Sequence, residues 1–269
     1  CIRDRRMKQL LEIEKKGDEY KKQLFLGKTE QTIPIERRNF KQAEQIMETM
    51  VEYKEMRMMY ACAIKEIRTK FDVLDTEFSI RYQRNPINFI TTRVKSTHGI
   101  FEKMNRISPR FTLKDVEENL SDIAGVRVIC SYIDDIYRLA AALTEQDDIC
   151  LLKEKDYIRN PKPNGYRSLH LIVSVPVFFA DHKKELKVEV QIRTIAMDFW
   201  ASLEHQIKYK KDISDQQEVI ARLKQCADTI AETDISMLDI RRHIEGTGEA
   251  EADNAVLIEK IKRLDKPII

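Results

Sequence analysis

The stretch 185–193 alternates apolar and polar residues, which predicts a β-strand with one buried face. Side chains two positions apart share a face of a strand, so four polar side chains line the other face. These are Lys187, Glu189, Gln191 and Arg193. A face of this kind can simply be solvated, so the strand alone does not define a site.

Three other segments have the composition and spacing of strands: 126–132, 151–157 and 168–175. Apolar residues at helical spacing predict one long helix or a helical pair over 40–78, and a second helix from near Pro86 to Met104. Asp134 is the expected N-cap of a helix that ends near Leu143. Further helices are predicted over 194–210, 215–243 and 252–264, and residues 1–34 suggest a charged helix or two.

The middle of the chain is therefore mixed, and both ends are helical. We expect an α+β fold, with a mixed β-sheet of four to five strands flanked by helices. We divide the chain into a charged helical N-terminal extension (1–39), a sheet-containing domain (40–211) and a C-terminal helical extension (212–269).

Composition narrows the class of protein. The 269 residues are enough for one substantial core. Charged residues make up 34% of the chain but balance to +2, so a general attraction to nucleic acid or to a membrane surface is not expected. Five cysteines without CxxC spacing, no signal-peptide core and no apolar run long enough for a bilayer favour a reduced, cytoplasmic protein.

Three sets of polar residues would meet if the strands share one sheet. The acidic set is Asp122 with Glu189, a pair that could hold Mg²⁺ together with phosphate oxygens. The cationic set is Arg93, Lys95, Lys103, Arg106, Arg127, Lys155 and Lys162. The third set follows an Asn-Gly turn and comprises Asn164, Tyr166, Ser168 and His170.

Each of these residues also has an ordinary structural explanation. A single cation is usually a solvated surface charge, a single tyrosine usually packs, and a histidine on a strand is usually a satisfied core residue. The sequence has no GxxxxGK[ST] loop and no GxGxxG turn, so side-chain cations and a metal would have to bind any nucleoside triphosphate. Neither structural-zinc spacing nor a Ser-His-Asp arrangement is visible.

Four stretches together resemble the synthetase domain of the RelA/SpoT family, and most of all its small alarmone synthetases. They are NPINFITTRVKSTHGIFEKMNR, DIAGVRVICSYIDDIY, KEKDYIRNPKPNGYRSLHLIV and VEVQIRTIAMDFWASLEHQIKYK. The resemblance covers roughly residues 71–211. It implies a nucleotidyltransferase-like domain that transfers the β,γ-pyrophosphate of ATP to the 3′-hydroxyl of GTP or GDP, giving AMP and an alarmone of the stringent response.

The resemblance also implies roles for individual residues. Asp122 would bind Mg²⁺, and Glu189 would share the ion, activate the 3′-hydroxyl, or do both. The ATP side would consist of two arginines around adenine and three cations on the phosphates: Arg93, Arg127, Lys95, Lys103 and Arg106. On the acceptor side Tyr166 would stack on guanine, and the remaining residues would be Asn164, His170, Gln191, Asp198, Lys155 and Lys162.

Two other functions stay open from the sequence. The chain could be a catalytically silent nucleotide- or RNA-binding regulator with the same fold, although both acidic positions are intact. It could also be a nucleotidyltransferase-like enzyme with a different acceptor, because a fold does not determine a function. Nucleic acid is not required by the expected reaction.

Assembly is a further expectation. The helices predicted over 40–78 and 215–243 carry more apolar surface than a small sheet domain needs, and burying it between protomers would avoid an exposed patch. The small alarmone synthetases form homotetramers, so a homotetramer is expected here. The alternative is that these helices fold back on their own domain.

Overall fold

The computed structural model describes residues 37–107, 112–209 and 216–248. The chain divides into two units, Cys1–Met50 and Val51–Ile269. In the first unit the described residues, 37–50, are helical. The helices predicted within 1–34 and over 252–264 lie outside the described residues, and the domain boundaries proposed at 39/40 and 211/212 stay predictions.

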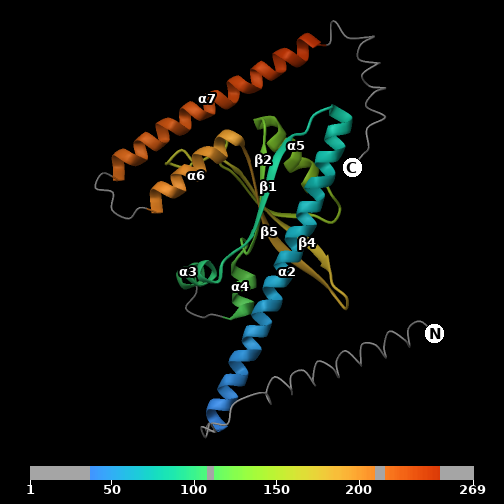
Figure 1. Ribbon diagram of the computed structural model, residues 1–269, viewed down its shortest axis with the longest axis vertical. Helices are drawn as coiled ribbons and strands as arrows, with labels where there is room; N and C mark the ends of the chain where they lie inside the picture. The colour runs from blue at the N-terminus through green and yellow to red at the C-terminus, as the bar shows by residue number, and fades with distance from the viewer. Residues whose placement is uncertain (1–36, 108–111, 210–215, 249–269) are drawn as a thin grey trace, which may run out of the picture. The chain divides into compact units, whose positions relative to one another are not determined.

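A mixed sheet of five strands forms the centre of the second unit, in the order β1-β2-β5-β4-β3 (Figure 1). The strands are β1 Ile87–Val94, β2 Ala124–Cys130, β3 Cys150–Asp156, β4 Leu169–Phe178 and β5 Lys183–Thr194. The pair β2 and β5 is parallel, and the other neighbouring pairs are antiparallel. The expected sheet of four to five strands is therefore confirmed.

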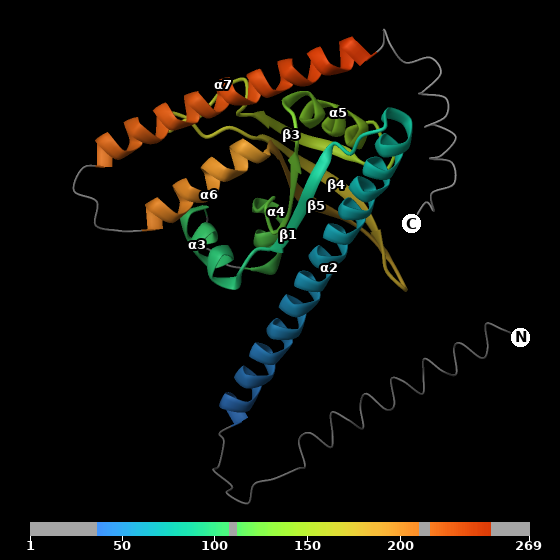
Figure 2. The same cartoon turned by 45° about the horizontal axis from the view of Figure 1, so that its top comes forward.

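The described helices account for the rest of the regular structure. They are α2 Arg37–Tyr82, α3 Thr97–Ile107, α4 Leu113–Asn119, α5 Ile133–Thr144, α6 Ile195–Tyr209 and α7 Gln216–Gly248. In both overall views α7 runs beside α6 and α5, and it packs against both (Figure 2). No helix in these described ranges is both long and apolar enough to cross a membrane.

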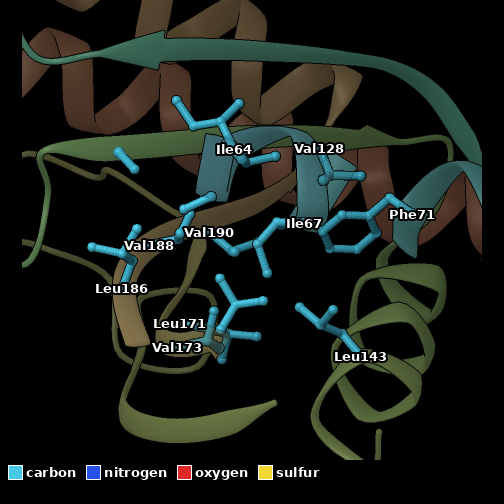
Figure 3. Packing of buried hydrophobic residues seen from close by; sticks show 14 of the residues in the cluster. Ile64, Ile67, Phe71, Val128, Leu143, Leu171, Val173, Leu186, Val188 and Val190 are labelled. Carbon is cyan, nitrogen blue, oxygen red and sulfur yellow. The ribbon is translucent and has the colours of Figure 1, made fainter. Parts of the chain in front are cut away.

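One face of the sheet is the hydrophobic core. Buried residues of α2 recur every three or four positions, which puts them on one side of the helix: Tyr60, Ile64, Ile67, Phe71 and Leu74. Figure 3 shows Ile64, Ile67 and Phe71 among apolar side chains of the central strands and of α5. The opposite face of β5 is left to its polar residues, as the alternating pattern predicted.

The helix predicted from Pro86 is wrong in its first half. Residues 87–94 form the edge strand β1, which pairs antiparallel with β2, and the helix begins only at Thr97. Ile90 and Val94 are four positions apart, and that spacing puts two residues on one face of a strand as well as on one face of a helix. The β-branched run Ile-Thr-Thr decides for the strand.

Smaller boundary differences have local causes. Strand β2 spans Ala124–Cys130 rather than 126–132, because α5 already begins at Ile133. Tyr132 is the N-cap and makes no side-chain capping bond, whereas Asp134 lies in the first turn, where a carboxylate is stabilised by the helix N-terminus. Helix α7 continues through Gly248 instead of ending near His243.

Candidate active site

Parallel pairing of β2 and β5 brings the two predicted carboxylates to the same region. Asp122 lies just before β2, and Glu189 lies on β5 directly opposite Gly125 of β2. Two lysines contact Asp122 Oδ2: Lys95 Nζ at 2.9 Å and Lys103 Nζ at 2.8 Å. The other oxygen, Asp122 Oδ1, is buried and has no hydrogen-bond partner among the described residues. It is therefore an acceptor available to a cation.

The two lysines keep Asp122 ionised. Burial alone would raise the pKa of Asp122, but the hydrogen bonds and charges of Lys103 and Lys95 outweigh it, so the pKa lies below its ordinary value. No group of three or more His, Cys, Asp or Glu within the described ranges could hold a metal ion. A cation at this pair would need further ligands from a bound substrate, as is usual for Mg²⁺ with phosphates.

Glu189 is the start of a chain of polar contacts that leads to Tyr166. Its Oε2 accepts a hydrogen bond from Gln191 Nε2 at 3.0 Å, and its Oε1 lies 3.6 Å from His170 Nδ1. His170 Nε2 is in turn 2.8 Å from the Tyr166 hydroxyl. Glu189 and Tyr166 are thus linked through one histidine on the same side of the sheet, as the sequence model of the site requires.

The environment of Glu189 favours its charged form. Burial raises its pKa, but the contacts with His170 and the Gln191 amide more than compensate, and the pKa lies below the ordinary value. The negative charge of Asp122 acts in the opposite direction on the Glu189 carboxylate. The two carboxylates therefore lie close enough to interact.

Aromatic rings and cations surround Tyr166. Tyr157 and His170 each lie edge-on to it, with ring centroids at 6.0 and 5.8 Å, and Trp200 lies at 6.5 Å. The ammonium of Lys162 is 4.7 Å from the centroid of the Tyr166 ring. Burial raises the pKa of Tyr166, so the phenol stays protonated at neutral pH and retains its hydrogen bond with His170.

A cavity of about 140 Å³ opens beside Glu189. It is lined by residues of β1, β2 and β5: Thr91, Thr92, Arg93, Gly125, Val126, Arg127, Glu189 and Gln191. Arg93 pairs with Gly125 and Arg127 with Thr91 in the sheet register, so the two arginines come from neighbouring strands. A Cβ at Gly125 would lie 3.4 Å from the Arg93 side chain, so Gly125 and Arg93 are direct neighbours in the wall of the cavity.

Sequence reasoning put Arg193 on the polar face but did not assign it to the site. Arg193 is 2% exposed, and its Nη2 donates a hydrogen bond to Gln191 Oε1 at 2.6 Å. Its Nη1 lies 3.4 Å from Asp198 Oδ1, which is 3.5 Å from Arg127 Nη1. The guanidinium also lies over the Tyr166 ring, 5.7 Å from the centroid. The sequence signal that could have assigned Arg193 to the site is its position two residues beyond Gln191, on the same face of β5.

The other predicted site residues are Asn164, Lys155 and Arg106. Asn164 uses its amide locally: Nδ2 donates to Glu204 Oε1 at 2.9 Å, and Oδ1 accepts from the backbone N–H of Tyr166 at 3.2 Å. Lys155 lies opposite His170 in the sheet register, with an exposed side chain. Arg106 lies in the exposed last turn of α3. Their roles stay predictions.

Fold and site together define a family. The model for the region found in RelA/SpoT proteins matches residues 92–214. The GTP pyrophosphokinase YwaC of Bacillus subtilis (strain 168) is 42% identical over 196 residues, which is 73% of this chain and 93% of that protein. The GTP pyrophosphokinase YjbM of the same organism is 35% identical over 193 residues, or 72% of this chain and 89% of that protein.

Solved structures agree with this similarity. Small alarmone synthetase 2 from Bacillus subtilis superposes with a TM-score of 0.64 at 42% identity, covering 71% of this chain and 99% of that one. Small alarmone synthetase 1 from Bacillus subtilis, bound to its product pppGpp, gives a TM-score of 0.65 at 34% identity, covering 72% and 98%. The chain belongs to the RelA/SpoT family.

Replacing Asp122 with Asn should change stability in a pH-dependent way. The lysine contacts hold the folded-state pKa below the unfolded value of about 3.9, so the ionised carboxylate contributes stability above that pH. This contribution is lost as the pH falls through the folded-state value. The melting-temperature difference between wild type and Asp122→Asn should be constant from about pH 5 to 7. Below about pH 4 the wild type should lose stability relative to Asp122→Asn.

Asp72→Asn is the matched control, because Asp72 is an exposed carboxylate on α2 with 57% of its side chain accessible. Melting curves of the three proteins at several pH values provide the measurement. A melting-temperature difference between wild type and Asp122→Asn that stayed constant down to about pH 3 would contradict the lowered pKa of Asp122.

Proposed function

We propose that this chain transfers the β,γ-pyrophosphate of ATP to the 3′-hydroxyl of GTP or GDP, giving AMP and guanosine pentaphosphate or tetraphosphate. The observation that carries the proposal is the position of Glu189. This carboxylate borders the cavity that Arg93 and Arg127 help to line, and it also begins the contact chain through His170 to Tyr166. It therefore lies between a site suited to one nucleotide and a site suited to another.

The names of the relatives agree with this reaction. They are GTP pyrophosphokinases, and small alarmone synthetase 1 from Bacillus subtilis has been solved with pppGpp and with AMPCPP. The first is a guanosine alarmone, and the second is an ATP analogue. In this chain we assign the cavity to the ATP side and the Tyr166 side to the acceptor.

On the ATP side, Arg93 and Arg127 would stack on the two faces of adenine, since planar guanidinium groups stack well on aromatic rings. Lys95 and Lys103 are already directed to Asp122, where the phosphates of ATP would meet the carboxylate pair. Arg106, from the same helix as Lys103, would add charge farther out. Lysines suit this task because they act as point charges on phosphate.

A magnesium ion fits the carboxylates at this position. The buried, unpartnered Asp122 Oδ1 would supply one oxygen ligand, and Glu189, which lies near enough to interact with Asp122 electrostatically, would supply another. Magnesium usually takes one or two carboxylates and completes its shell with phosphates and water. When bound, such an ion neutralises charge on the β- and γ-phosphates.

On the acceptor side, Tyr166 would stack on guanine, and Gln191, Asp198 and His170 would offer hydrogen-bonding groups. Lys162 now lies over the ring of Tyr166, but its exposed side chain can turn toward the phosphates of the acceptor. Lys155 would join it there. Asn164 would contribute both by its hydrogen bond with the backbone of Tyr166 and by contact with guanine.

The chemical step needs positioning and one proton acceptor. The 3′-oxygen forms a bond to the β-phosphorus of ATP, the bond from that phosphorus to the α,β-bridging oxygen breaks, and AMP leaves with that oxygen. The hydroxyl proton passes to the Glu189 carboxylate, which is ionised at neutral pH because its pKa is lowered. In-line positioning and charge neutralisation supply most of the catalysis of such transfers.

Glu189→Gln should fold normally and lose pyrophosphate transfer by several orders of magnitude. Base assistance alone is worth roughly 10²–10⁴-fold, and the substitution also removes a metal ligand. Thin-layer separation of products from labelled ATP with GTP, GDP or RNA measures the reaction and identifies the acceptor. Glu185→Gln is the matched control, on the same strand but with an exposed side chain.

Near wild-type turnover by Glu189→Gln with magnesium present would rule out an essential role for this carboxylate. Absence of any transferred product from the wild type would instead favour a catalytically silent nucleotide-binding protein. A labelled RNA product would indicate a different acceptor.

Tyr166→Ala should raise the Michaelis constant for GTP and leave that for ATP near its wild-type value. Stacking of a base on an aromatic ring is worth about 1–3 kcal/mol, which corresponds to roughly 5- to 150-fold in affinity. Tyr166→Phe keeps the ring and removes only the hydroxyl that contacts His170, so it should raise the constant for GTP less than Tyr166→Ala does. An unchanged constant for GTP in Tyr166→Ala would contradict the stacking assignment.

We further propose a homotetramer in the cytoplasm. Large apolar side chains are exposed on α7 and on α2 after residue 50, among them Ile220, Ile235, Met237, Ile240, Val51, Met58 and Val73. The four cysteines of the described residues are free thiols, as is usual in a reducing compartment. Light scattering at micromolar concentration should give four times the chain mass of 31.7 kDa, and a species of one chain mass would exclude the assembly.

A further inference from the structure

Residues 162–168, here named the acceptor loop, carry Tyr166 and Asn164 between β3 and β4. Two backbone hydrogen bonds close the loop on itself, from Gly165 N–H to Lys162 O at 2.8 Å and from Lys162 N–H to Tyr166 O at 3.2 Å. These bonds shape the loop, but they do not attach it to the rest of the protein. Helix α6 supplies one attachment, the hydrogen bond from Asn164 to Glu204, and helix α7 supplies two further contacts.

The first contact is a close approach of two backbones. Gly165 has φ +91°, a conformation that residues with a side chain rarely adopt. A Cβ at this position would lie 2.5 Å from Ala227 Cβ and 3.2 Å from Lys224 Cα. Ala227 is 3% exposed, so the loop backbone covers it. The loop therefore lies directly on α7, with no room for a side chain between them.

The second contact is a guanidinium that bridges loop and helix. Arg167 Nη1 donates to Ala227 O at 2.9 Å, and Nη2 donates to Asp228 Oδ1 at 3.1 Å. The side chain of Arg167 is 16% exposed, whereas that of Asp228 is 43% exposed. The half-exposed ion pair is worth little by itself, so the bond to the helix backbone is the more important of the two.

Tyr166 lies next to this attachment in the chain. Tyr166 turns toward His170 and the site, and its neighbour Arg167 turns toward α7. Trp200 of α6 lies beside Tyr166 and donates from Nε1 to Leu223 O, one helical turn before Ala227 O. The same stretch of α7 thus holds both the loop and the helix that border the Tyr166 ring.

We propose that Arg167 is a positioning residue, which together with the Gly165–Ala227 contact holds the acceptor loop on α7 in the geometry that binds the guanine nucleotide. The inference rests on the proposed function for the identity of the acceptor. Loosening the loop would reduce the affinity for GTP, because part of the binding energy would then be used to order it. ATP would be unaffected, since its cavity is lined by β1, β2 and β5.

Kinetics of four variants test this. Arg167→Ala removes the bridge between loop and helix, and Ala227→Leu pushes the loop away from the helix. Each variant should raise the Michaelis constant for GTP about tenfold or more. In both, the constant for ATP should stay near the wild-type value. Arg167→Lys keeps one donor and should fall between. Arg222→Ala removes an exposed arginine of the same helix and should match wild type.

An unchanged constant for GTP in Arg167→Ala, or an equal rise for ATP, would overturn the proposal. Hydrogen exchange tests the positioning role of Arg167 without measuring the reaction. Amides of the acceptor loop should exchange faster in Arg167→Ala and Ala227→Leu than in wild type and Arg222→Ala. Equal exchange in all four proteins would also overturn it. If the wild type makes no alarmone but the loop amides behave as expected, the proposed function fails and the attachment to α7 stands.

Discussion

Parallel pairing of β2 with β5 is the constraint on which the rest of the structure depends. Its register puts Gly125 opposite Glu189 and Arg127 opposite Gln191, so one pair of strands brings together the cavity, an arginine and the central carboxylate. The same register directs Val188 and Val190 to the core beneath α2. A slip by one residue would exchange the two faces, burying Glu189 and exposing the valines. Core packing and site geometry are therefore determined together.

The site concentrates charge at a cost that only suitable partners offset. Asp122 and Glu189 repel one another, and each is stabilised by neighbours of its own, two lysines in one case and His170 with Gln191 in the other. Arg193 is buried, which lowers its pKa, and it lies against Asp198 and the ring of Tyr166. Perturbed groups of this kind cluster at functional sites. The arrangement suits substrates that bring phosphate charge with them.

Helix α7 links this centre to the outer parts of the second unit. Its backbone accepts hydrogen bonds from Arg167 and Trp200, and Asp234 accepts one from the hydroxyl of Thr194 at the end of β5. Farther along, Arg241 pairs with Asp134 of α5 at 2.6 Å. A segment whose sequence offered only a helical pattern thus contacts the acceptor loop, the last strand and two helices. These contacts hold the neighbouring elements in place.

The sequence by itself determined the strands with clear alternation and the polar face of β5, because periodicity is a local property. It also proposed most of the residues that the structure brings together around Glu189. It wrongly predicted a helix where β1 lies, since a spacing of four satisfies a strand as well as a helix, and the structure forms a strand there that pairs with β2. The sequence placed Arg193 on the polar face of β5 but gave neither Arg193 nor Arg167 a partner. Arg193 contacts Asp198 and Tyr166, and Arg167 contacts Ala227, which is 60 residues away along the chain. These partners belong to other elements of the fold. Such contacts exist only once the chain has folded, so the tertiary structure alone decided them.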